Sequence, residues 1–216
     1  MVAGKQSGLD RKQHWEEVYG SKKAHETSWY QPVPAPSLAM IRNAANGGAP
    51  SLIDVGGGAS LLVDCLLDQG FCDLAVLDIS GRALGQARER LGPLAARVDW
   101  IEADVTQYEP GRTWDIWHDR AALHFLTDSA DRTRYVRVLM RALAVGGQAI
   151  IAAFAPDGPR KCSGLQIVRY DALALGAELG PEFVLQEERF DAHLTPAGGE
   201  QRFGFYRFRR EAQSVI

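Results

Sequence analysis

The 216-residue sequence lacks long apolar runs and paired cysteines. No segment offers roughly 18 consecutive apolar residues, and the first residues lack the apolar core of a secretory signal, so we expect no membrane span and no signal peptide. The three cysteines form no C-x-x-C pair and leave an odd count. This pattern favours reduced thiols and therefore a cytoplasmic protein.

An excess of basic residues is also missing. Lysine and arginine total 24 against 27 aspartates and glutamates, so the net charge is −3. Without a positive surplus to neutralise a phosphate backbone, a nucleic-acid partner is disfavoured. The sequence contains neither an H-E-x-x-H motif nor a Cys/His cluster with ligand spacing, so we predict no metal site.

The first 50 residues differ from the rest in composition. A polar helix is expected at residues 10–19, and prolines at positions 32, 34, 36 and 50 then interrupt regular structure. Within this stretch Ser37 is expected to cap a short helix that reaches Arg42. We therefore distinguish an N-terminal segment, residues 1–50, from a main body, residues 51–216, within a single domain.

From residue 51 onward, strand and helix signals alternate. Strand candidates lie at residues 51–55, 74–78, 98–101, 114–117 and 148–154. Between them, Ser80 is expected to cap one helix, and Thr127 or Asp128 another that Gly146-Gly147 ends. This alternation predicts an α/β fold whose parallel sheet has helices on both faces. Two aromatic-rich segments near the C-terminus, "EFVLQEERF" and "QRFGFYRFRR", are expected to add an antiparallel pair.

Three glycines follow the first predicted strand, in the segment "LIDVGGGAS". Ligands of open parallel sheets bind outside the carboxyl ends of the strands, which is where Gly56, Gly57 and Gly58 are expected. Residues without a Cβ atom allow positive φ and close approach of a ligand. The dinucleotide fingerprint G-x-G-x-x-G is only partly met, because Leu61 takes the place of the third glycine. A purely structural turn is the alternative.

Acidic residues stand at the ends of the first three predicted strands. Asp78 follows Gly56 by about 20 residues, where a carboxylate can accept both ribose hydroxyls of a nucleotide-like ligand. Ser80 is expected to cap the next helix, which leaves Asp78 free, and Asp104 can accept an adenine amino group. Asp54 would lie close to the pyrophosphate of a nicotinamide dinucleotide. A cofactor with an ammonium and a sulfonium group and no phosphate, such as S-adenosylmethionine, therefore fits better.

Four segments, "LIDVGGGAS", "AVLDIS", "IEADVTQYEP" and "WDIWHDRAALHFL", resemble in this order the class I S-adenosylmethionine-dependent methyltransferases, over residues 10–154. That family's G-x-G-x-S pattern is supplied by Gly56, Gly58 and Ser60. The resemblance implies a Rossmann-like, mostly parallel seven-stranded sheet with an antiparallel last strand, and residues 51–216 as the cofactor-binding domain. It also implies a cofactor site made of Asp54, Gly56, Gly57, Gly58, Asp78, Ile79, Asp104, Val105 and Arg120.

The N-terminal segment narrows the resemblance. Its "HWEEVYG" and "TSWY" are similar to the opening of the subgroup that contains the elongation-factor lysine methyltransferases and many small bacterial relatives. That similarity implies that Trp15, Tyr19 and Trp29 line the cofactor site, with residues 1–50 acting as a lid. Since Trp15 and Tyr19 are i, i+4 neighbours on one helix face, a core stripe is the alternative.

Methyl transfer from a sulfonium chiefly requires a nucleophile held in line with the methyl carbon. A general base is needed only where the nucleophile arrives protonated. His118 and Asp119, at the end of the fourth strand, are the catalytic candidates, although strand alternation places them on opposite faces. His118 as a structural histidine is the alternative, and His124 is a weaker candidate. The loop at residues 155–171, which contains Cys162, is expected to wall the acceptor site.

We therefore predict a methyltransferase that uses S-adenosylmethionine, releases S-adenosylhomocysteine and acts on a small-molecule acceptor. A protein lysine is the alternative acceptor. Nucleic acid is disfavoured further because "HDRA" stands where amino-methylating enzymes of DNA bases carry [DNS]-P-P-[YFW]. Two functions of another class stay open, a non-catalytic S-adenosylmethionine-binding protein and an NAD-dependent oxidoreductase.

Overall fold

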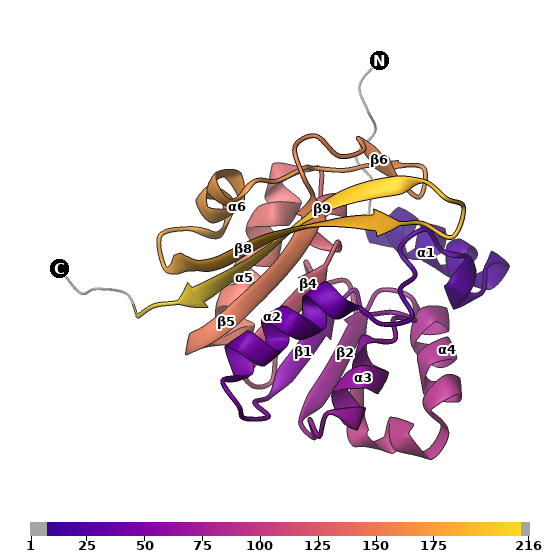
Figure 1. Ribbon diagram of the computed structural model, residues 1–216, viewed down its shortest axis with the longest axis horizontal. Coiled ribbons are helices and arrows are strands. Elements are labelled where there is room, and N and C mark those ends of the chain that lie inside the picture. The colour runs from indigo at the N-terminus through magenta and orange to yellow at the C-terminus, as the bar shows by residue number, and fades with distance from the viewer. Residues whose placement is uncertain (1–7, 213–216) are drawn as a thin grey trace.

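A seven-stranded sheet organises the chain in the computed structural model, which describes residues 8–212 (Figure 1). Its strand order is β3-β2-β1-β4-β5-β9-β8, with β1 to β5 parallel and β9 antiparallel to both its neighbours. The strands are β1 (Leu52–Val55), β2 (Leu74–Asp78), β3 (Val98–Glu102), β4 (Trp114–Arg120), β5 (Leu143–Phe154), β8 (Phe183–Leu194) and β9 (Glu200–Arg210). The predicted α/β fold with an antiparallel last strand is confirmed.

Helices cover both faces of the sheet, as predicted. One face packs against α2 (Ala35–Ala45), α3 (Leu62–Asp68) and α4 (Gly81–Leu91), and the other against α5 (Ser129–Ala142) and α6 (Ala172–Leu179). Central strands buried on both sides read as continuous apolar runs. The four residues of β1 and the five of β2 are accordingly all buried.

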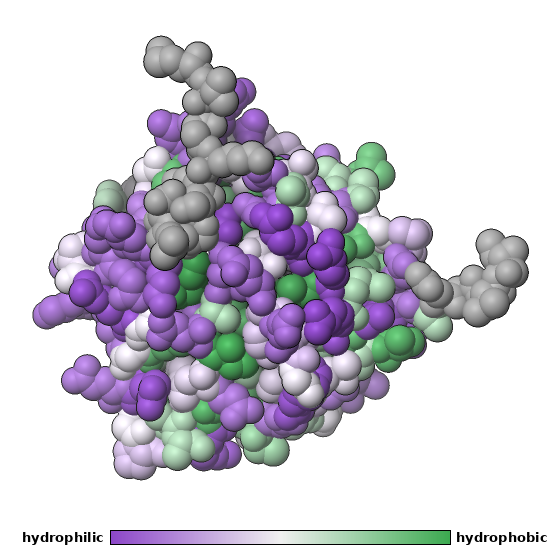
Figure 2. Space-filling view, turned by 180° about the vertical axis from the view of Figure 1, so that it is seen from behind, coloured by the Kyte–Doolittle hydropathy of each residue, from purple (hydrophilic) through white to green (hydrophobic). Residues whose placement is uncertain are grey.

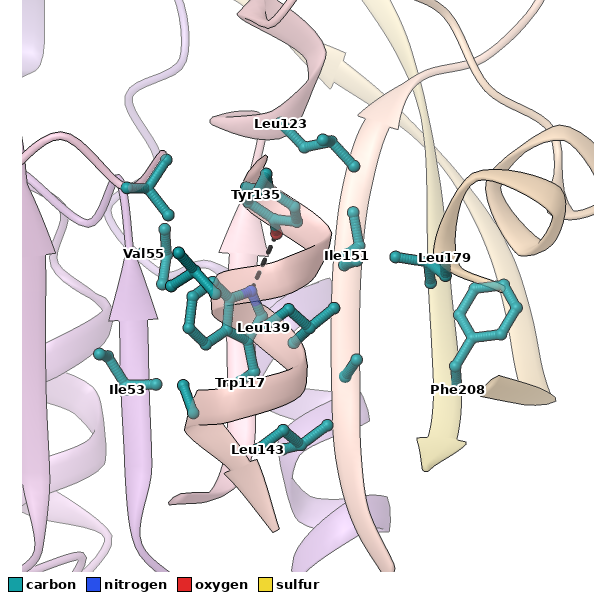
Figure 3. Close-up of a cluster of buried hydrophobic side chains, with 14 of the residues drawn as sticks. Ile53, Val55, Trp117, Leu123, Tyr135, Leu139, Leu143, Ile151, Leu179 and Phe208 are labelled. Atoms are coloured by element: carbon teal, nitrogen blue, oxygen red, sulfur yellow. Dashed lines mark hydrogen bonds between the residues drawn. The ribbon is translucent and has the colours of Figure 1, made fainter. Parts of the chain in front are cut away.

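The core between α5 and the sheet contains a buried hydrogen bond between two aromatic side chains. Figure 3 shows the Trp117 indole and the Tyr135 ring meeting between β4 and α5, where the indole Nε1 donates to the Tyr135 hydroxyl at 2.9 Å. Ile53, Val55 and Ile151 pack around this pair. A buried indole N–H is thus satisfied without water, which fixes the orientation of α5 over β4.

Helix starts in the body follow the predicted caps. The Ser80 hydroxyl accepts from the Ala83 N–H at 3.2 Å at the start of α4, and the Asp128 carboxylate accepts from the Ala130 N–H at 2.9 Å before α5. These bonds satisfy amides that would otherwise lack an intrahelical partner. Of the two residues proposed to open α5, Asp128 is therefore the cap.

Two predicted boundaries were wrong. Ser37 does not cap α2, because the helix begins earlier, at Ala35, where the fixed φ of the neighbouring prolines suits a first turn. Gly146-Gly147 does not end α5, which stops at Ala142, but lies within β5. A Cβ at Gly147 would stand 2.9 Å from the Asp115 carbonyl oxygen, so this glycine allows close strand approach instead.

The N-terminal segment lies at the carboxyl ends of the parallel strands. Helix α1 (Gly8–Ser21) packs against α4, and the chain then runs through a short 3-10 helix, Ala24–Glu26, to α2. The small hairpin β6 (Lys161–Cys162) and β7 (Leu165–Gln166) lies at the same end of the sheet (Figure 1). A 3-10 helix, Gly92–Arg97, precedes β3 at the opposite end, and another, Leu123–Phe125, follows β4.

The face seen in Figure 2 is mostly hydrophilic, with hydrophobic residues scattered among charged ones. Single exposed apolar side chains are normal on a folded protein. Among residues 8–212 no helix is long and apolar enough to cross a membrane.

Candidate functional site

A cavity of about 1020 Å³, measured out to its mouth, opens at the carboxyl ends of β1 to β4. The N-terminal segment and the β6–β7 hairpin contribute to its walls. Of the residues predicted from the sequence, the cavity is lined by Trp15, Tyr19, Trp29, Asp54, Gly56, Gly57, Asp78, Ile79, Asp104, Val105, His118 and Arg120. The fold thus gathers residues from a span of more than a hundred positions at one place.

The glycine turn after β1 has no room for side chains. Gly56 has a φ of +65°, and a Cβ there would meet the Ala122 Cβ at 2.7 Å. A Cβ at Gly57 would stand 2.5 Å from the Asp54 carboxylate. Gly58 has a φ of +44° and fits closely against Asp78, although it does not itself line the cavity. The turn is therefore shaped for close backbone approach, as the sequence predicted.

Gly57→Ala is expected to lower both stability and affinity for S-adenosylhomocysteine. The added methyl group would push on a buried carboxylate and on Val76, which the surrounding strands hold in place. Overpacking of this kind destabilises by about 1–3 kcal/mol. Chemical denaturation and calorimetric titration would measure the two effects. Gly85→Ala is the matched control, because a Cβ at this α4 position meets nothing within 4 Å and should stabilise the helix. Equal behaviour of the two variants would contradict the expectation.

Asp78 lies buried at the end of β2 with one oxygen occupied. Its Oδ1 accepts from the Ser80 N–H at 2.8 Å, so Ser80 does not leave Asp78 wholly free, in contrast to the prediction. Burial raises the pKa of Asp78 to about 7, against which the Ser80 bond acts. Its Oδ2 and the Tyr19 hydroxyl both lie against the glycine turn, 2.9 Å from where a Gly58 Cβ would be. This second oxygen is the one available to a ligand.

Asp104 is held by protein groups on both oxygens. Its Oδ1 accepts from the Thr106 N–H and hydroxyl, and its Oδ2 accepts from Arg11 at 2.8 Å. Partial burial would raise the pKa of Asp104, but the hydrogen bonds from Arg11 and Thr106 outweigh it and lower this pKa. Arg11 also donates to Asp131 of α5 at 2.6 Å. Arg11 was not predicted from the sequence, because nothing near it along the chain indicates ion pairs with residues 93 and 120 positions away.

Aromatic side chains of the N-terminal segment cover the cavity. The Trp15 ring lies 5.8 Å from Trp29 and 4.9 Å from Phe125, both edge-on, and 6.3 Å from Tyr19 between ring centroids. The Arg120 guanidinium donates to the Trp29 carbonyl at 3.0 Å. These contacts fix the segment over the ends of the strands, so the three aromatic residues line the cavity as well as pack together.

Asp54, His118 and Ser37 form a buried chain of hydrogen bonds. His118 Nδ1 donates to Asp54 Oδ1 at 2.6 Å, and the Ser37 hydroxyl lies 2.9 Å from His118 Nε2, where it acts as donor. The three residues are 3%, 1% and 0% exposed. Both ring nitrogens of His118 are thus engaged within the protein, which favours the structural alternative over a general base. Ser37, expected only as a helix cap, is the third member.

Asp119 lies on the other face of β4, away from the cavity. Its carboxylate accepts from the Tyr135 hydroxyl at 2.7 Å and from the Ala122 and Leu123 amides at 2.7 and 3.0 Å. Burial raises its pKa to about 6. The prediction that Asp119 acts in catalysis is therefore corrected: it anchors the turn after β4, because strand alternation turns it from the ligand side.

His124 does not reach the cavity either. Its ring is fully buried against Phe125 and Phe154, and neither ring nitrogen has a hydrogen-bond partner among the described residues. Burial lowers the pKa of His124 to about 3, so the ring is neutral. It packs as an aromatic residue.

Arg120 is the cationic group of the cavity without an ion pair in the described part of the chain. Its one hydrogen bond goes to a backbone carbonyl, and burial lowers its pKa although Asp54 acts in the opposite direction. A buried guanidinium with unused donors fits a ligand carboxylate. Together with the open oxygen of Asp78 and the glycine turn, this donor set fits S-adenosylmethionine, which carries a carboxylate, an ammonium and a ribose.

Residues 53–149 match a protein family described as a methyltransferase domain. The chain is 26% identical over 149 residues to the eEF1A lysine and N-terminal methyltransferase of Bos taurus. That match covers 66% of this chain but 21% of the relative, so the chain spans about a fifth of the relative's length.

Solved structures of methyltransferases share the fold. The N-methyltransferase NodS from Bradyrhizobium japonicum in complex with S-adenosylhomocysteine has a TM-score of 0.71 and 18% identity, over 91% of this chain and 98% of that one. The 1,6-didemethyltoxoflavin-N1-methyltransferase of Burkholderia thailandensis has a TM-score of 0.69 and 16% identity, over 98% and 94%. The sheet topology and the match over residues 53–149 make the chain similar to S-adenosylmethionine-dependent methyltransferases, and the NodS structure is a complex with S-adenosylhomocysteine.

Proposed function

We propose that the chain transfers the methyl group of S-adenosylmethionine to a small-molecule acceptor. The observation that carries this proposal is the charge arrangement around the glycine turn, where Arg120 forms no ion pair with residues 8–212 while Asp54 and Asp78 line the same cavity. The cofactor's methionyl end is a zwitterion, and its adenosine offers ribose hydroxyls. Buried groups of matching charge and polarity can satisfy both ends.

Each residue has a separate part in the proposed complex. The open oxygen of Asp78 accepts from the ribose, Arg120 pairs with the methionyl carboxylate, and Asp54 faces the ammonium group while His118 holds its orientation. The adenine would lie between Ile79, Val105 and the carboxylate of Asp104, which is hydrogen-bonded to Arg11. Bound there, the cofactor supplies an electrophilic methyl group, so the protein has chiefly to orient the acceptor and exclude water.

The N-terminal segment, residues 1–50, is the proposed lid of this site. Trp15, Tyr19 and Trp29 line the cavity, and Arg11 ties the segment to α5 and to Asp104. Residues 1–7 of this segment lie outside the described residues. Closure by aromatic residues supports a compact acceptor, and the toxoflavin-type relative also acts on a small molecule according to its name.

A protein lysine is the second candidate acceptor, favoured by the eEF1A methyltransferase relative. The two candidates differ in where a transferred label ends up. Incubation of the full chain with labelled S-adenosylmethionine and a lysate would place label in protein bands for a lysine acceptor, and in the low-molecular-weight fraction for the proposed one.

Calorimetric titration with S-adenosylmethionine and S-adenosylhomocysteine should show micromolar binding of both. NADH and NADPH are the controls and should not bind, because Asp54 lies where a pyrophosphate would come near. Binding of NADH in place of the first pair would overturn the cofactor assignment for this chain. Binding of S-adenosylmethionine without transfer to any fraction of a lysate would instead support a non-catalytic binding protein.

A further inference from the structure

The cavity has two chemically different halves. The half at the ends of β2 and β3 carries Asp78 and Asp104, the acids proposed for the adenosine. The other half lies beyond β1, between the end of β4, the strand β9 and the β6–β7 hairpin. Its walls include Phe125, Cys162 and Phe203. This second half is where an acceptor would meet the methyl group.

An aromatic wall, defined here as Phe125, His124, Phe154 and Phe203, backs the second half. The ring centroids of Phe125 and His124 are 4.3 Å apart, and those of His124 and Phe154 are 5.2 Å apart. Those of Phe154 and Phe203 are 4.7 Å apart, and each contact is edge-on. Phe125 and Phe203 line the cavity, while the other two rings lie behind them. Rings fixed by neighbouring rings present a rigid apolar surface, which suits a flat ligand.

This half lacks a free carboxylate among the described lining residues. Arg120 lies near the Cys162 thiol, with which it interacts electrostatically. Of the three carboxylates that line the cavity within residues 8–212, two belong to the adenosine half, and Asp54 is bonded to His118. An alkylammonium acceptor would therefore have no carboxylate partner beside the aromatic wall, and the sulfonium of the bound cofactor would repel it.

The second half also offers no group placed to take a proton, within the described lining. His118 uses both ring nitrogens inside the protein. Burial raises the pKa of Cys162 to about 11, so its thiol stays protonated near neutral pH. His124 lies behind the wall. An acceptor that must first lose a proton to a side chain is poorly served here.

We propose that the acceptor is a neutral aromatic heterocycle that presents the lone pair of an unprotonated ring nitrogen to the methyl group. This inference rests on the proposed methyltransferase function. The nitrogen lone pair forms the new bond to the methyl carbon while the carbon–sulfur bond breaks and its electron pair stays on sulfur. The positive charge passes from sulfur to the heterocycle, and a ring N–H proton, where present, leaves to water afterwards. No side chain is needed as a base.

Three probes of similar size test the inference on the full chain loaded with S-adenosylhomocysteine at neutral pH. Benzimidazole is neutral with an open ring nitrogen, 2-phenylethylamine is aromatic with an ammonium group, and Nα-acetyl-lysine amide represents a lysine. Calorimetry should show benzimidazole binding at least tenfold more tightly than either amine. With labelled S-adenosylmethionine, benzimidazole should also be the probe that gains label.

Phe203→Leu should weaken benzimidazole binding at least tenfold and leave the affinity for S-adenosylhomocysteine within about threefold, because it removes one ring of the wall alone. Phe205→Leu is the matched control, since Phe205 is equally buried on the same strand and face but does not line the cavity. If both variants unfold, the comparison of the three probes on the unaltered chain still decides.

The outcomes separate the inference from the function on which it rests. Failure of S-adenosylhomocysteine to bind would overturn the methyltransferase proposal itself. If S-adenosylhomocysteine binds, then an amine that binds as tightly as benzimidazole, or an absence of binding by all three probes, would overturn the inference. Benzimidazole affinity unchanged by Phe203→Leu would overturn it as well.

Discussion

Asp78→Asn should weaken S-adenosylhomocysteine binding about a hundredfold and, above neutral pH, stabilise the ligand-free protein. The variant keeps an oxygen that can accept from the Ser80 N–H, but it loses the charge that the ribose hydroxyls would meet. Two charge-assisted hydrogen bonds to a buried carboxylate amount to about 3 kcal/mol. The charged form of the same carboxylate destabilises the ligand-free folded protein, because burial raises its pKa to about 7.

The pH dependence of unfolding separates these two effects. A carboxyl whose folded pKa lies above its unfolded value contributes stability that is full below the unfolded pKa, 3.8, and is lost as pH rises through about 7. The shift corresponds to about 4 kcal/mol as an upper bound. The variant should therefore gain stability relative to the unaltered chain by up to about 1.4 kcal/mol per pH unit between the two pKa values, and near pH 8.5 it should be more stable by about 2–4 kcal/mol.

Chemical denaturation across this pH range would measure the difference, with calorimetry for the ligand. Asp104→Asn is the control, because Arg11 and Thr106 lower the pKa of that carboxyl and its loss should destabilise the protein near neutral pH. Parallel pH profiles for the Asp78 variant and the unaltered chain would show that folding does not raise the pKa of this carboxyl. Unchanged ligand affinity would remove Asp78 from the adenosine site.

His118→Leu should destabilise the protein by about 3 kcal/mol or more, whereas His124→Phe should be neutral or stabilising. Both histidines are buried to a similar degree, but they differ in their partners. Removing His118 would leave the Asp54 carboxylate and the Ser37 hydroxyl without their bonds in the interior, at a penalty typical of a broken buried pair. Within the described part of the chain, the ring nitrogens of His124 have no hydrogen-bond partner to lose.

Urea unfolding of the two variants side by side measures this contrast. Adding Asp54→Asn to His118→Leu should restore part of the lost stability, because the unpaired charge is then gone. A His124 variant as unstable as the His118 variant would mean that burial of the ring, rather than its hydrogen bonds, determines stability at both positions.

Local sequence patterns determine most of what was predicted correctly. Apolar runs such as residues 74–78 are buried on both faces, so composition alone marks them as central strands. Asp78 and Arg120 could be assigned to one cavity because parallel strands bring their carboxyl ends to the same edge. Caps such as Ser80 depend on neighbours within three residues, which the sequence displays directly.

The features that were missed depend on contacts between distant segments. The bond between Ser37 and His118 spans 81 positions, and the ion pair of Arg11 with Asp131 spans 120. No periodicity or spacing encodes such pairs, because they form only once α1 and α2 have packed. Asp119 was misassigned for a different reason. Its place at the end of β4 was correct, but its carboxylate accepts from the Ala122 and Leu123 amides of the following turn and from the Tyr135 hydroxyl of α5.

The double ion pair of Arg11 has a consequence for the pace of turnover. One guanidinium joins α1 to the residues after β3 and to α5, and Arg11 also lines the cavity. Movement of α1 away from the cavity would require the ion pairs of Arg11 with Asp104 and with Asp131 to break together. If the chain is a methyltransferase as proposed, we therefore expect release of S-adenosylhomocysteine, and not methyl transfer, to be the rate-limiting step. Arg11 would then affect the turnover rate through product release without contacting the methyl group.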